Sequence, residues 1–281
     1  MTSDGTREVL AVRYGNRTTT RAESFLNYHL YGEPDADIEI DYYFWVIRDG
    51  GGTTLIDTGF APAAGDRRRR AWWTTPADAL PAAGVDPGSV HTIVVTHGHW
   101  DHTGNLHQFP DAQLVMSQAE YRFWTSAMAR RPHFAAHAEP DEIAYLQRAD
   151  DEQRLTLIQG QHELADGIEL IEVGGHTPGQ LVVSVTTAAG TVVLASDAVH
   201  FYEEVERDRP FAIVADLPAM YRAYDLLADM AAQPGTRLVA GHDPQVRTRY
   251  ARHPASPDMT DLTAPTGGDS CHDLPAGRPG I

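Results

Sequence analysis

Short hydrophobic runs alternate along the chain with longer segments in which apolar residues recur every three or four positions. The short runs are rich in valine, isoleucine and aromatic residues, a composition typical of strands. They predict strands at residues 9–14, 38–47, 53–57, 90–96, 114–117, 155–158, 168–173, 181–186, 191–195 and 237–240. Glycine-containing turns at Asp49-Gly50-Gly51-Gly52 and Ala188-Ala189-Gly190 would join two pairs of these strands as hairpins.

The longer segments have helical spacing and predict helices at residues 76–83, 118–130, 140–151 and 217–232. Two of these helices, with a loop at 132–139, would form a helical insertion over 118–153, which either packs against a sheet or serves as a lid or pocket wall. Two β-rich halves, each followed by helix, are most economically arranged as two packed sheets with helices outside. We expect one domain over 1–251 and an irregular tail over 252–281, which is rich in Pro, Gly, Asp and Thr.

The charge balance limits the possible partners. The 281 residues include 22 basic and 39 acidic groups, a formal net charge of −17, which would repel nucleic acid. Every basic residue is an arginine, so Schiff-base chemistry and a lysine-dependent phosphate loop are excluded. The run Arg67-Arg68-Arg69-Arg70 is the one basic cluster, and we expect a solvated loop there rather than an anion site.

Cysteine content and hydropathy bear on the compartment. The single cysteine, Cys271, cannot form an intramolecular disulfide. No apolar segment is of signal-peptide type or approaches the length of a membrane span. We therefore expect a cytoplasmic protein that does not bind membranes.

A dense group of possible metal ligands follows the strand predicted at 90–96. Three histidines and an aspartate lie within six positions, as His97, His99, Asp101 and His102. Imidazole nitrogen and carboxylate oxygen are the ligand types that zinc takes. His97 and His99, two residues apart in an extended loop, can point at one ion. Asp101 and His102 can turn toward a second ion as the chain enters a helix.

Three later residues also follow predicted strands and sit beside or near glycine or serine in short turns. His176 lies in Gly174-Gly175-His176-Thr177-Pro178-Gly179, Asp197 in Ser196-Asp197-Ala198 and His242 in Gly241-His242-Asp243. Strand ends converge on one rim of a sheet, so these loops could present their side chains to a single place. Together with the first cluster they predict a centre for two ions.

The order of these motifs resembles that of the metallo-β-lactamase superfamily. The resemblance covers roughly residues 9–250 and includes Leu55-Ile56-Asp57-Thr58-Gly59, which matches the opening hairpin of that family. It implies an α/β fold, an αββα sandwich with the helical insertion after the metal-binding loop and the metals on the rim between the sheets. Asp57 would support the site without being a ligand, unless it is a simple turn aspartate. The implied ligands are His97, His99 and His176 for one ion, Asp101, His102 and His242 for the other, and Asp197 as the bridge.

Two divalent ions roughly 3.5–4 Å apart lower the pKa of a shared water and polarise an acyl or phosphoryl oxygen. We expect the bridging hydroxide to attack a carbonyl carbon, with Asp101 also acting as the proton carrier. Zinc is the default ion, and manganese, iron or cobalt would fit the same mixed nitrogen and oxygen donors. Hydrolysis is the expected reaction class.

Within the superfamily, the chain most resembles N-acyl homoserine lactonases. This resemblance implies opening of a lactone or related ester, with an N-acyl homoserine lactone as one candidate, and Trp100 lining the acyl pocket or packing under its loop. Those lactonases place a substrate-contacting tyrosine three residues after the bridging aspartate, where this chain has His200. His200 could donate a similar hydrogen bond, Tyr202 could reach in, and Phe201 could line the pocket or pack. Otherwise the pocket is built for another substrate.

Several alternatives share the metal site. A glyoxalase II-type thioesterase normally has a helical C-terminal domain, for which residues 252–281 are too short. A β-lactamase is disfavoured by Asp101, and a phosphodiesterase acting on nucleic acid by the net charge of −17. A non-catalytic metal-binding sensor would have lost a ligand, and all seven are present. We expect a small-molecule acyl substrate as the partner, and a homodimer is a possible assembly.

Overall fold

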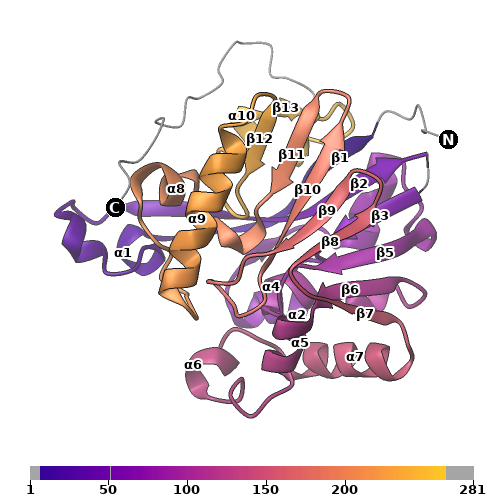
Figure 1. Ribbon diagram of the computed structural model, residues 1–281, viewed down its shortest axis with the longest axis horizontal. Coiled ribbons are helices and arrows are strands. Elements are labelled where there is room, and N and C mark those ends of the chain that lie inside the picture. The colour runs from indigo at the N-terminus through magenta and orange to yellow at the C-terminus, as the bar shows by residue number, and fades with distance from the viewer. Residues whose placement is uncertain (1–6, 51, 264–281) are drawn as a thin grey trace.

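Two β-sheets lie one behind the other, with helices on their outer sides (Figure 1). The computed structural model describes residues 7–50 and 52–263. The larger sheet has the order β13-β14-β1-β2-β3-β5-β6-β7, with β4 also paired to β1. Its strands are β1 (Glu8–Thr20), β2 (Asp37–Asp49), β3 (Gly52–Ile56), β4 (Ala71–Trp72), β5 (Val90–Val95), β6 (Gln113–Ser117), β7 (Leu155–Ile158), β13 (Ala251–Arg252) and β14 (Met259–Asp261).

The smaller sheet has the order β12-β11-β10-β9-β8. Its strands are β8 (Gln161–Ala165), β9 (Ile168–Glu172), β10 (Leu181–Thr187), β11 (Gly190–Leu194) and β12 (Thr236–Val239). The α-helices are α1 (Arg21–Ser24), α2 (Pro62–Arg67), α3 (Pro76–Ala79), α4 (Trp100–Thr103), α5 (Gln118–Trp124), α6 (Pro132–Ala135), α7 (Pro140–Asp151), α8 (Tyr202–Arg207), α9 (Leu217–Ala231) and α10 (Val246–Arg249). The short 3₁₀ helices are η1 (Tyr28–Tyr31), η2 (Leu80–Ala83), η3 (Pro87–Ser89), η4 (Leu106–Gln108) and η5 (Ser196–Ala198).

The larger sheet is buried on both faces, because alternate residues of its strands enter two different hydrophobic clusters. In β2, Tyr43 and Trp45 face the cluster shared with the smaller sheet, whereas Tyr42 and Phe44 face the opposite cluster. This alternation follows from the two-residue period of a strand. On the face of the smaller sheet that points away from the larger sheet, α9 covers the strands, with Tyr224 fully buried (Figure 1). The predicted sandwich of two sheets with outer helices is confirmed.

Parallel pairing brings the candidate ligands to one rim. Strand β3 pairs in parallel with β5, with Ile56 opposite Val94, so that Asp57 and His97 follow at the same end of the sheet. Strand β11 pairs in parallel with β12, with Leu194 opposite Val239, which places Asp197 and His242 at one end of the other sheet. The two rims meet at the site described below.

Some elements differ from the sequence expectations. The helix expected to reach residue 130 ends at Trp124, and the expected loop at 132–139 contains the short helix α6. Strand β8 was not predicted because its residues are largely exposed and carry little hydrophobic signal. Helix α8, which begins at Tyr202, was also missed because it has only six residues.

The tail prediction is wrong at its beginning. Residues Met259–Asp261 form β14, which pairs antiparallel with β1 through Leu10↔Asp261. Met259 and Leu262 are buried, so a few apolar residues and backbone hydrogen bonds hold this segment on the sheet edge. So short a strand leaves no periodic pattern in the sequence. Gly51, Cys271 and the remainder of the predicted tail lie outside the described residues. Within the described part of the chain, no helix is long and apolar enough to cross a membrane.

Candidate metal centre

Two groups of ligand-type side chains meet where the rims of the two sheets come together. His97, His99, His176 and Asp197 each offer one ligand atom within 4.8 Å of the others, and Asp101, His102 and His242 form a second such group. The structure thus brings together all seven residues that the sequence suggested as ligands. All except Asp101, which is partly exposed, are buried.

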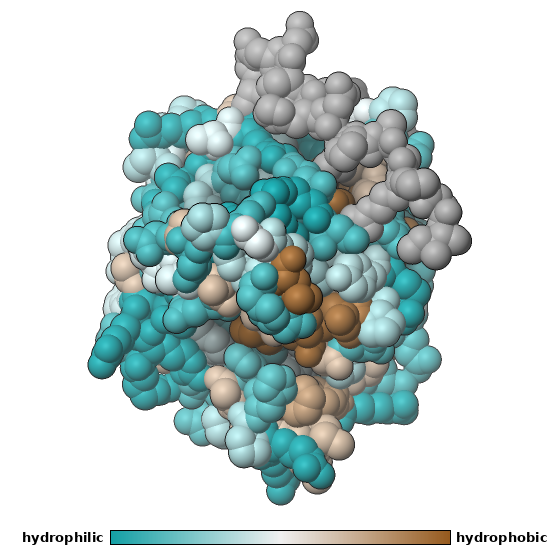
Figure 2. All heavy atoms as spheres, turned by 90° about the vertical axis from the view of Figure 1, so that its left-hand side faces the viewer, coloured by the Kyte–Doolittle hydropathy of each residue, from teal (hydrophilic) through white to brown (hydrophobic). Residues whose placement is uncertain are grey.

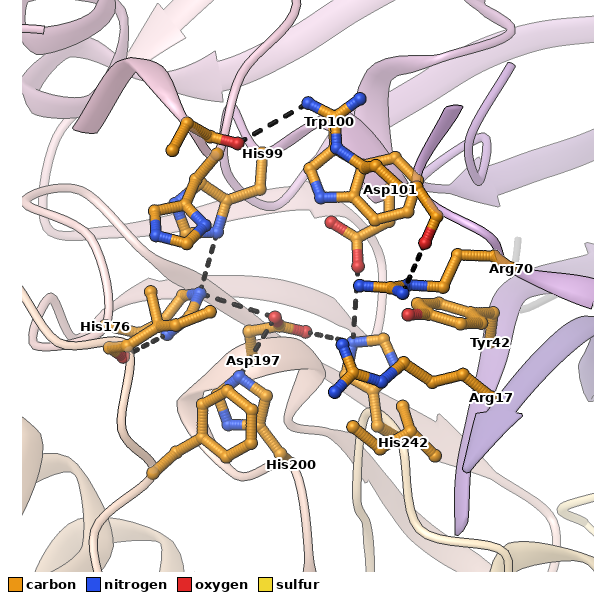
Figure 3. Close-up of a pocket in the computed structure, with 16 residues that line it drawn as sticks. Arg17, Tyr42, Arg70, His99, Trp100, Asp101, His176, Asp197, His200 and His242 are labelled. Carbon is orange, nitrogen blue, oxygen red and sulfur yellow. Dashed lines mark hydrogen bonds and ion pairs between the residues drawn. The ribbon is translucent and has the colours of Figure 1, made fainter. Parts of the chain in front are cut away.

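Asp197 lies between the two groups and turns one oxygen toward each. Its Oδ1 is 3.1 Å from Nε2 of His102 and 3.0 Å from Nε2 of His242. Its Oδ2 is 3.3 Å from Nε2 of His176 (Figure 3). The same oxygen is 3.7 Å from Nε2 of His97. This is the position from which one carboxylate could bridge two cations.

Hydrogen bonds on the outer side of the rings orient the imidazoles. Nδ1 of His97 contacts the Thr96 hydroxyl at 3.1 Å, and Nδ1 of His102 contacts Asp57 at 2.7 Å. Backbone carbonyl oxygens hold Nδ1 of His176 and of His242, at 2.9 and 2.8 Å. Such outer contacts fix the tautomer and orientation of a metal-binding histidine and leave Nε2 facing the centre.

Whether cations fit this centre can be judged from the side-chain atoms that face it, because several of them are buried and make no hydrogen bond. Nε2 of His97, Nε2 of His102 and Oδ1 of Asp197 are buried without a hydrogen-bond partner. Burial lowers the pKa of His97, His99 and His176 well below the ordinary value, and neighbouring imidazoles lower it further. The neutral imidazoles of His97, His99 and His176 beside a buried carboxylate are a donor set that divalent ions satisfy.

Asp57 supports this centre through contacts with Thr96 and His102. One oxygen accepts a hydrogen bond from the backbone N–H of Thr96 at 2.8 Å, and the other lies 2.7 Å from both the Thr96 hydroxyl and Nδ1 of His102. The residue is fully buried and adopts a left-handed φ of 61°. A simple turn aspartate would need none of these contacts, so the structure places Asp57 as a supporting residue.

Glu120 is a second supporting residue, which sequence reasoning missed. Its buried carboxylate accepts hydrogen bonds from the backbone N–H of Gly98 at 2.9 Å and of Gly179 at 2.8 Å. It therefore ties the loop of His97 and His99 to the turn of His176. In the sequence, Ser117 and Glu120 have the three-residue spacing of an N-terminal capping box. That pattern predicts a helix cap and does not indicate that Glu120 binds two loops.

Glycine is required at both of these loop positions. A Cβ atom on Gly98 would lie 2.4 Å from Cδ1 of Trp124, and one on Gly179 would lie 2.3 Å from the backbone nitrogen of Glu120. The close approach of the two loops to α5 thus depends on the absence of side chains there. The first turns of the helical insertion hold the metal-binding loops in place.

A cavity of about 330 Å³ opens beside the two groups of ligands. Figure 2 shows hydrophobic side chains gathered around a hollow on one face of an otherwise largely hydrophilic surface. Trp100 and His200 line the cavity, as the sequence suggested. Trp100 also stacks on Phe60 with ring centroids 5.0 Å apart, so its lining and packing roles coexist. Other lining residues are Arg17, Ile40, Tyr42, Arg68, Arg70, Ala136, His137, Phe211 and Ile213.

Phe201 and Tyr202 do not line this cavity, which corrects the sequence expectation for both. Phe201 lies behind the wall, with its ring centroid 5.7 Å from that of Phe25. Tyr202 begins α8 and is turned into the core, where the guanidinium of Arg249 lies 3.6 Å from its ring centroid. The chain changes direction where α8 begins, at Tyr202. Of the residues 200–202, His200 is therefore the one whose side chain lines the cavity.

His200 faces the centre from this wall. Its Nε2 lies 3.1 Å from Oδ2 of Asp197, and its Nδ1 lies 3.3 Å from the buried Glu204. The ring stacks on Phe211, with centroids 3.6 Å apart. Burial opposes the charged form, but the two carboxylates prevail and raise the pKa of His200 to about 9.

The protein has two mixed sheets and, where their rims meet, a site rich in histidine and aspartate. These features are typical of one class of protein, the hydrolases with the metallo-beta-lactamase fold. The chain belongs to the metallo-beta-lactamase superfamily, whose family model matches residues 41–242. The predicted family resemblance is thereby confirmed.

Individual relatives include several lactonases. The chain is 25% identical over 241 residues to the N-acyl homoserine lactonase AttM of Azorhizobium caulinodans, covering 78% of this chain and 88% of that protein. It is 32% identical over 207 residues to metallo-beta-lactamase domain-containing protein 1 of Homo sapiens, covering 72% of this chain and 63% of that protein. The structure of AidC, a dizinc quorum-quenching lactonase in complex with the product N-hexanoyl-L-homoserine, aligns with a TM-score of 0.67 at 18% identity, covering 85% of this chain and 88% of that one.

Proposed function

We propose that this protein is a dinuclear metal-dependent hydrolase that opens a lactone or a related ester, with N-acyl homoserine lactones among the candidate substrates. The position of Asp197 carries this proposal, because its two oxygens face two separate groups of histidines. The names of the relatives support the lactone part, since AttM and AidC are lactonases. Zinc is the proposed ion, and manganese, iron or cobalt would suit the same donors.

His97, His99 and His176 would hold one ion, Asp101, His102 and His242 the other, and Asp197 would bridge them. When bound, such a pair supplies a nucleophile from water at neutral pH and stabilises negative charge on the substrate oxygens. Proton transfer and substrate positioning would be carried out by side chains at the cavity. There, the partly exposed carboxylate of Asp101 lies 4.0 Å from Nε2 of His242 and is placed to carry a proton to the departing alkoxide.

His200 is the proposed substrate-positioning group. It lines the cavity next to Asp197, and Glu204 holds its other nitrogen. An N–H group in this position can donate a hydrogen bond to the carbonyl oxygen of a bound ester and so hold it for attack. Trp100, which lines the cavity beside Asp101, would contact the acyl part of the substrate.

The test is a hydrolysis screen of the metal-loaded protein with lactones, thioesters, lactams and phosphodiesters, followed by proton release. We expect lactones or simple esters to be turned over and Asp101→Asn to lower kcat by at least about 100-fold, within the range for loss of a general acid or base. The exposed Asp111 offers a matched control, Asp111→Asn, which should retain full activity. Turnover of phosphodiesters alone would overturn the lactonase proposal.

A further inference from the structure

Arginines line one wall of the catalytic cavity, although the chain as a whole has a net charge of −17. Arg17 comes from β1, and Arg68 and Arg70 come from the segment between α2 and β4. The run of arginines at 67–70, which the sequence suggested to be a solvated loop, therefore contributes two side chains to the cavity. Figure 3 shows Arg17 and Arg70 reaching in beside Tyr42, on the side of Asp101 and His242.

Arg68 already has a role in the structure. Its guanidinium forms an ion pair with Glu139 of the insertion and lies 4.5 Å from the ring centroid of Trp100. The charge is thus balanced by a carboxylate, and the side chain covers the indole. Arg68 needs no ligand to account for its position.

Arg17 and Arg70 differ from Arg68 in this respect. Among the described residues, Arg70 forms no ion pair with a carboxylate, and its Nη1 donates to the backbone carbonyl oxygen of Arg68 at 2.5 Å. Arg17 contacts the Thr19 hydroxyl and forms an ion pair with Glu23 at 3.4 Å. The Glu23 side chain is 68% exposed, so water screens that pair strongly. Nε of Arg17 and Nε of Arg70 are both buried without a hydrogen-bond partner. Buried guanidinium nitrogens are normally satisfied, so these two point to an absent acceptor.

The two guanidinium groups also act on each other. Burial lowers the pKa of Arg17, and the charge of Arg70 lowers it further. The acidic groups that face the cavity, Asp101 and Asp197, belong to the donor set for the metal ions. Once those carboxylates are engaged by cations, the exposed carboxylate of Glu23 is the negative charge that remains paired with Arg17.

We propose that Arg17 and Arg70 form a subsite for a carboxylate group of the substrate, so that the preferred lactone or ester is itself an anion. Guanidinium groups bind carboxylates through charge-assisted hydrogen bonds in a geometry that few other side chains offer. The cavity volume of about 330 Å³ suits a compact molecule rather than a polymer. The assignment rests on the proposed hydrolase function and specifies its substrate class.

A matched pair of substrates tests the subsite directly. The γ-lactone of 2-hydroxyglutarate carries a carboxylate on its ring, and the corresponding carboxamide has nearly the same shape without the charge. With the metal-loaded wild-type protein we expect kcat/KM to be at least about tenfold higher for the carboxylate, the effect of one charge-assisted contact. Arg17→Gln and Arg70→Gln should each lower that ratio at least about threefold, and Arg122→Gln, at an exposed position on α5, should leave it unchanged.

Calorimetry supplies a readout that does not depend on turnover. The affinity of 2-hydroxyglutarate, the hydrolysis product, should fall in Arg17→Gln and Arg70→Gln, and the wild-type affinity should weaken with added salt. Unchanged affinity in both variants would overturn the subsite.

The outcomes also separate this inference from the proposed function. Equal kcat/KM for the carboxylate and the carboxamide would overturn the carboxylate subsite and leave the hydrolase intact. Turnover of neither lactone, with turnover of phosphodiesters, would overturn both. Stronger arginine-dependent competition by inorganic phosphate than by acetate would reassign the subsite to phosphate and overturn the carboxylate assignment.

Discussion

The carboxylate of Asp57 lies 2.7 Å from Nδ1 of His102, and both side chains are buried, the first directly after β3 and the second within α4. The contact fixes the outer nitrogen of a candidate ligand and leaves Nε2 directed at Asp197. A carboxylate in this position makes the imidazole a stronger donor to a metal ion.

Replacement of Asp57 should therefore weaken metal binding without removing a ligand. In Asp57→Asn, the amide nitrogen cannot accept the hydrogen bonds that the second carboxylate oxygen now accepts. We expect the affinity for the more weakly held ion to fall about 10- to 100-fold, measured by competition with a chromogenic chelator. The exposed Asp111→Asn variant is the control, and an unchanged affinity in Asp57→Asn would contradict the supporting role.

Removal of single histidines should separate the two groups of ligands. His176 belongs to one group and His242 to the other. We expect His176→Ala and His242→Ala each to lower the bound metal from about two ions per chain to about one, measured by elemental analysis after gel filtration. His91→Ala, at an exposed position on β5, should retain both ions. Identical loss of both ions in the two variants would indicate a single shared site.

Glu120 should matter for stability and for metal affinity together. Glu120→Gln keeps one acceptor oxygen but turns an N–H donor toward the backbone N–H of Gly98 or Gly179. Loss of a buried hydrogen bond of this kind costs about 1–3 kcal/mol of unfolding free energy, measurable by urea titration of the metal-free protein. The metal affinity should fall as well, because both ligand loops lose their common anchor. Glu163→Gln, at an exposed position on β8, should change neither quantity.

The ligand positions could be predicted from the sequence because each of the four loops that carry them comes after a short hydrophobic run. Ile93, Val94 and Val95, which precede His97, are fully buried in the sheet, and the motif that follows is dense enough to stand out. Asp197 and His242 could be placed at the same rim because parallel strands present their ends together. These features depend on local sequence, which is why they are visible without a structure.

The cavity walls could not be predicted in the same way. Arg17 and Arg70 are 53 positions apart and meet only because β1 and the segment before β4 lie side by side. The direction of Tyr202 depends on where α8 begins, and six residues leave no clear period in the sequence. Glu120 acts through two backbone N–H groups from distant loops, and no side-chain pattern reports such contacts.

Glu142 should make stability depend on pH near neutrality. Burial, opposed by a contact with Thr103, raises the pKa of this carboxyl from 4.5 to about 8. The Thr103 hydroxyl lies within reach of both the His99 carbonyl, at 3.1 Å, and Oε2 of Glu142, at 2.7 Å. A hydroxyl has one proton to give, so a protonated Glu142 can donate to Thr103 while Thr103 donates to His99.

The sign of the effect follows from the raised pKa. Below about pH 4.5 the carboxyl is protonated in both the folded and the unfolded chain, and its contribution to stability is fully present. As the pH rises toward 8, the unfolded chain releases the proton first, so the free energy of unfolding declines. Glu142→Gln retains an N–H donor for Thr103 and cannot titrate. We expect the stability difference between this variant and the wild-type protein to change by about 1–3 kcal/mol between pH 5 and 8 in urea titrations of the metal-free protein. Glu163→Gln should run parallel to the wild-type curve, and a parallel curve for Glu142→Gln would show that Glu142 is ionised throughout this range.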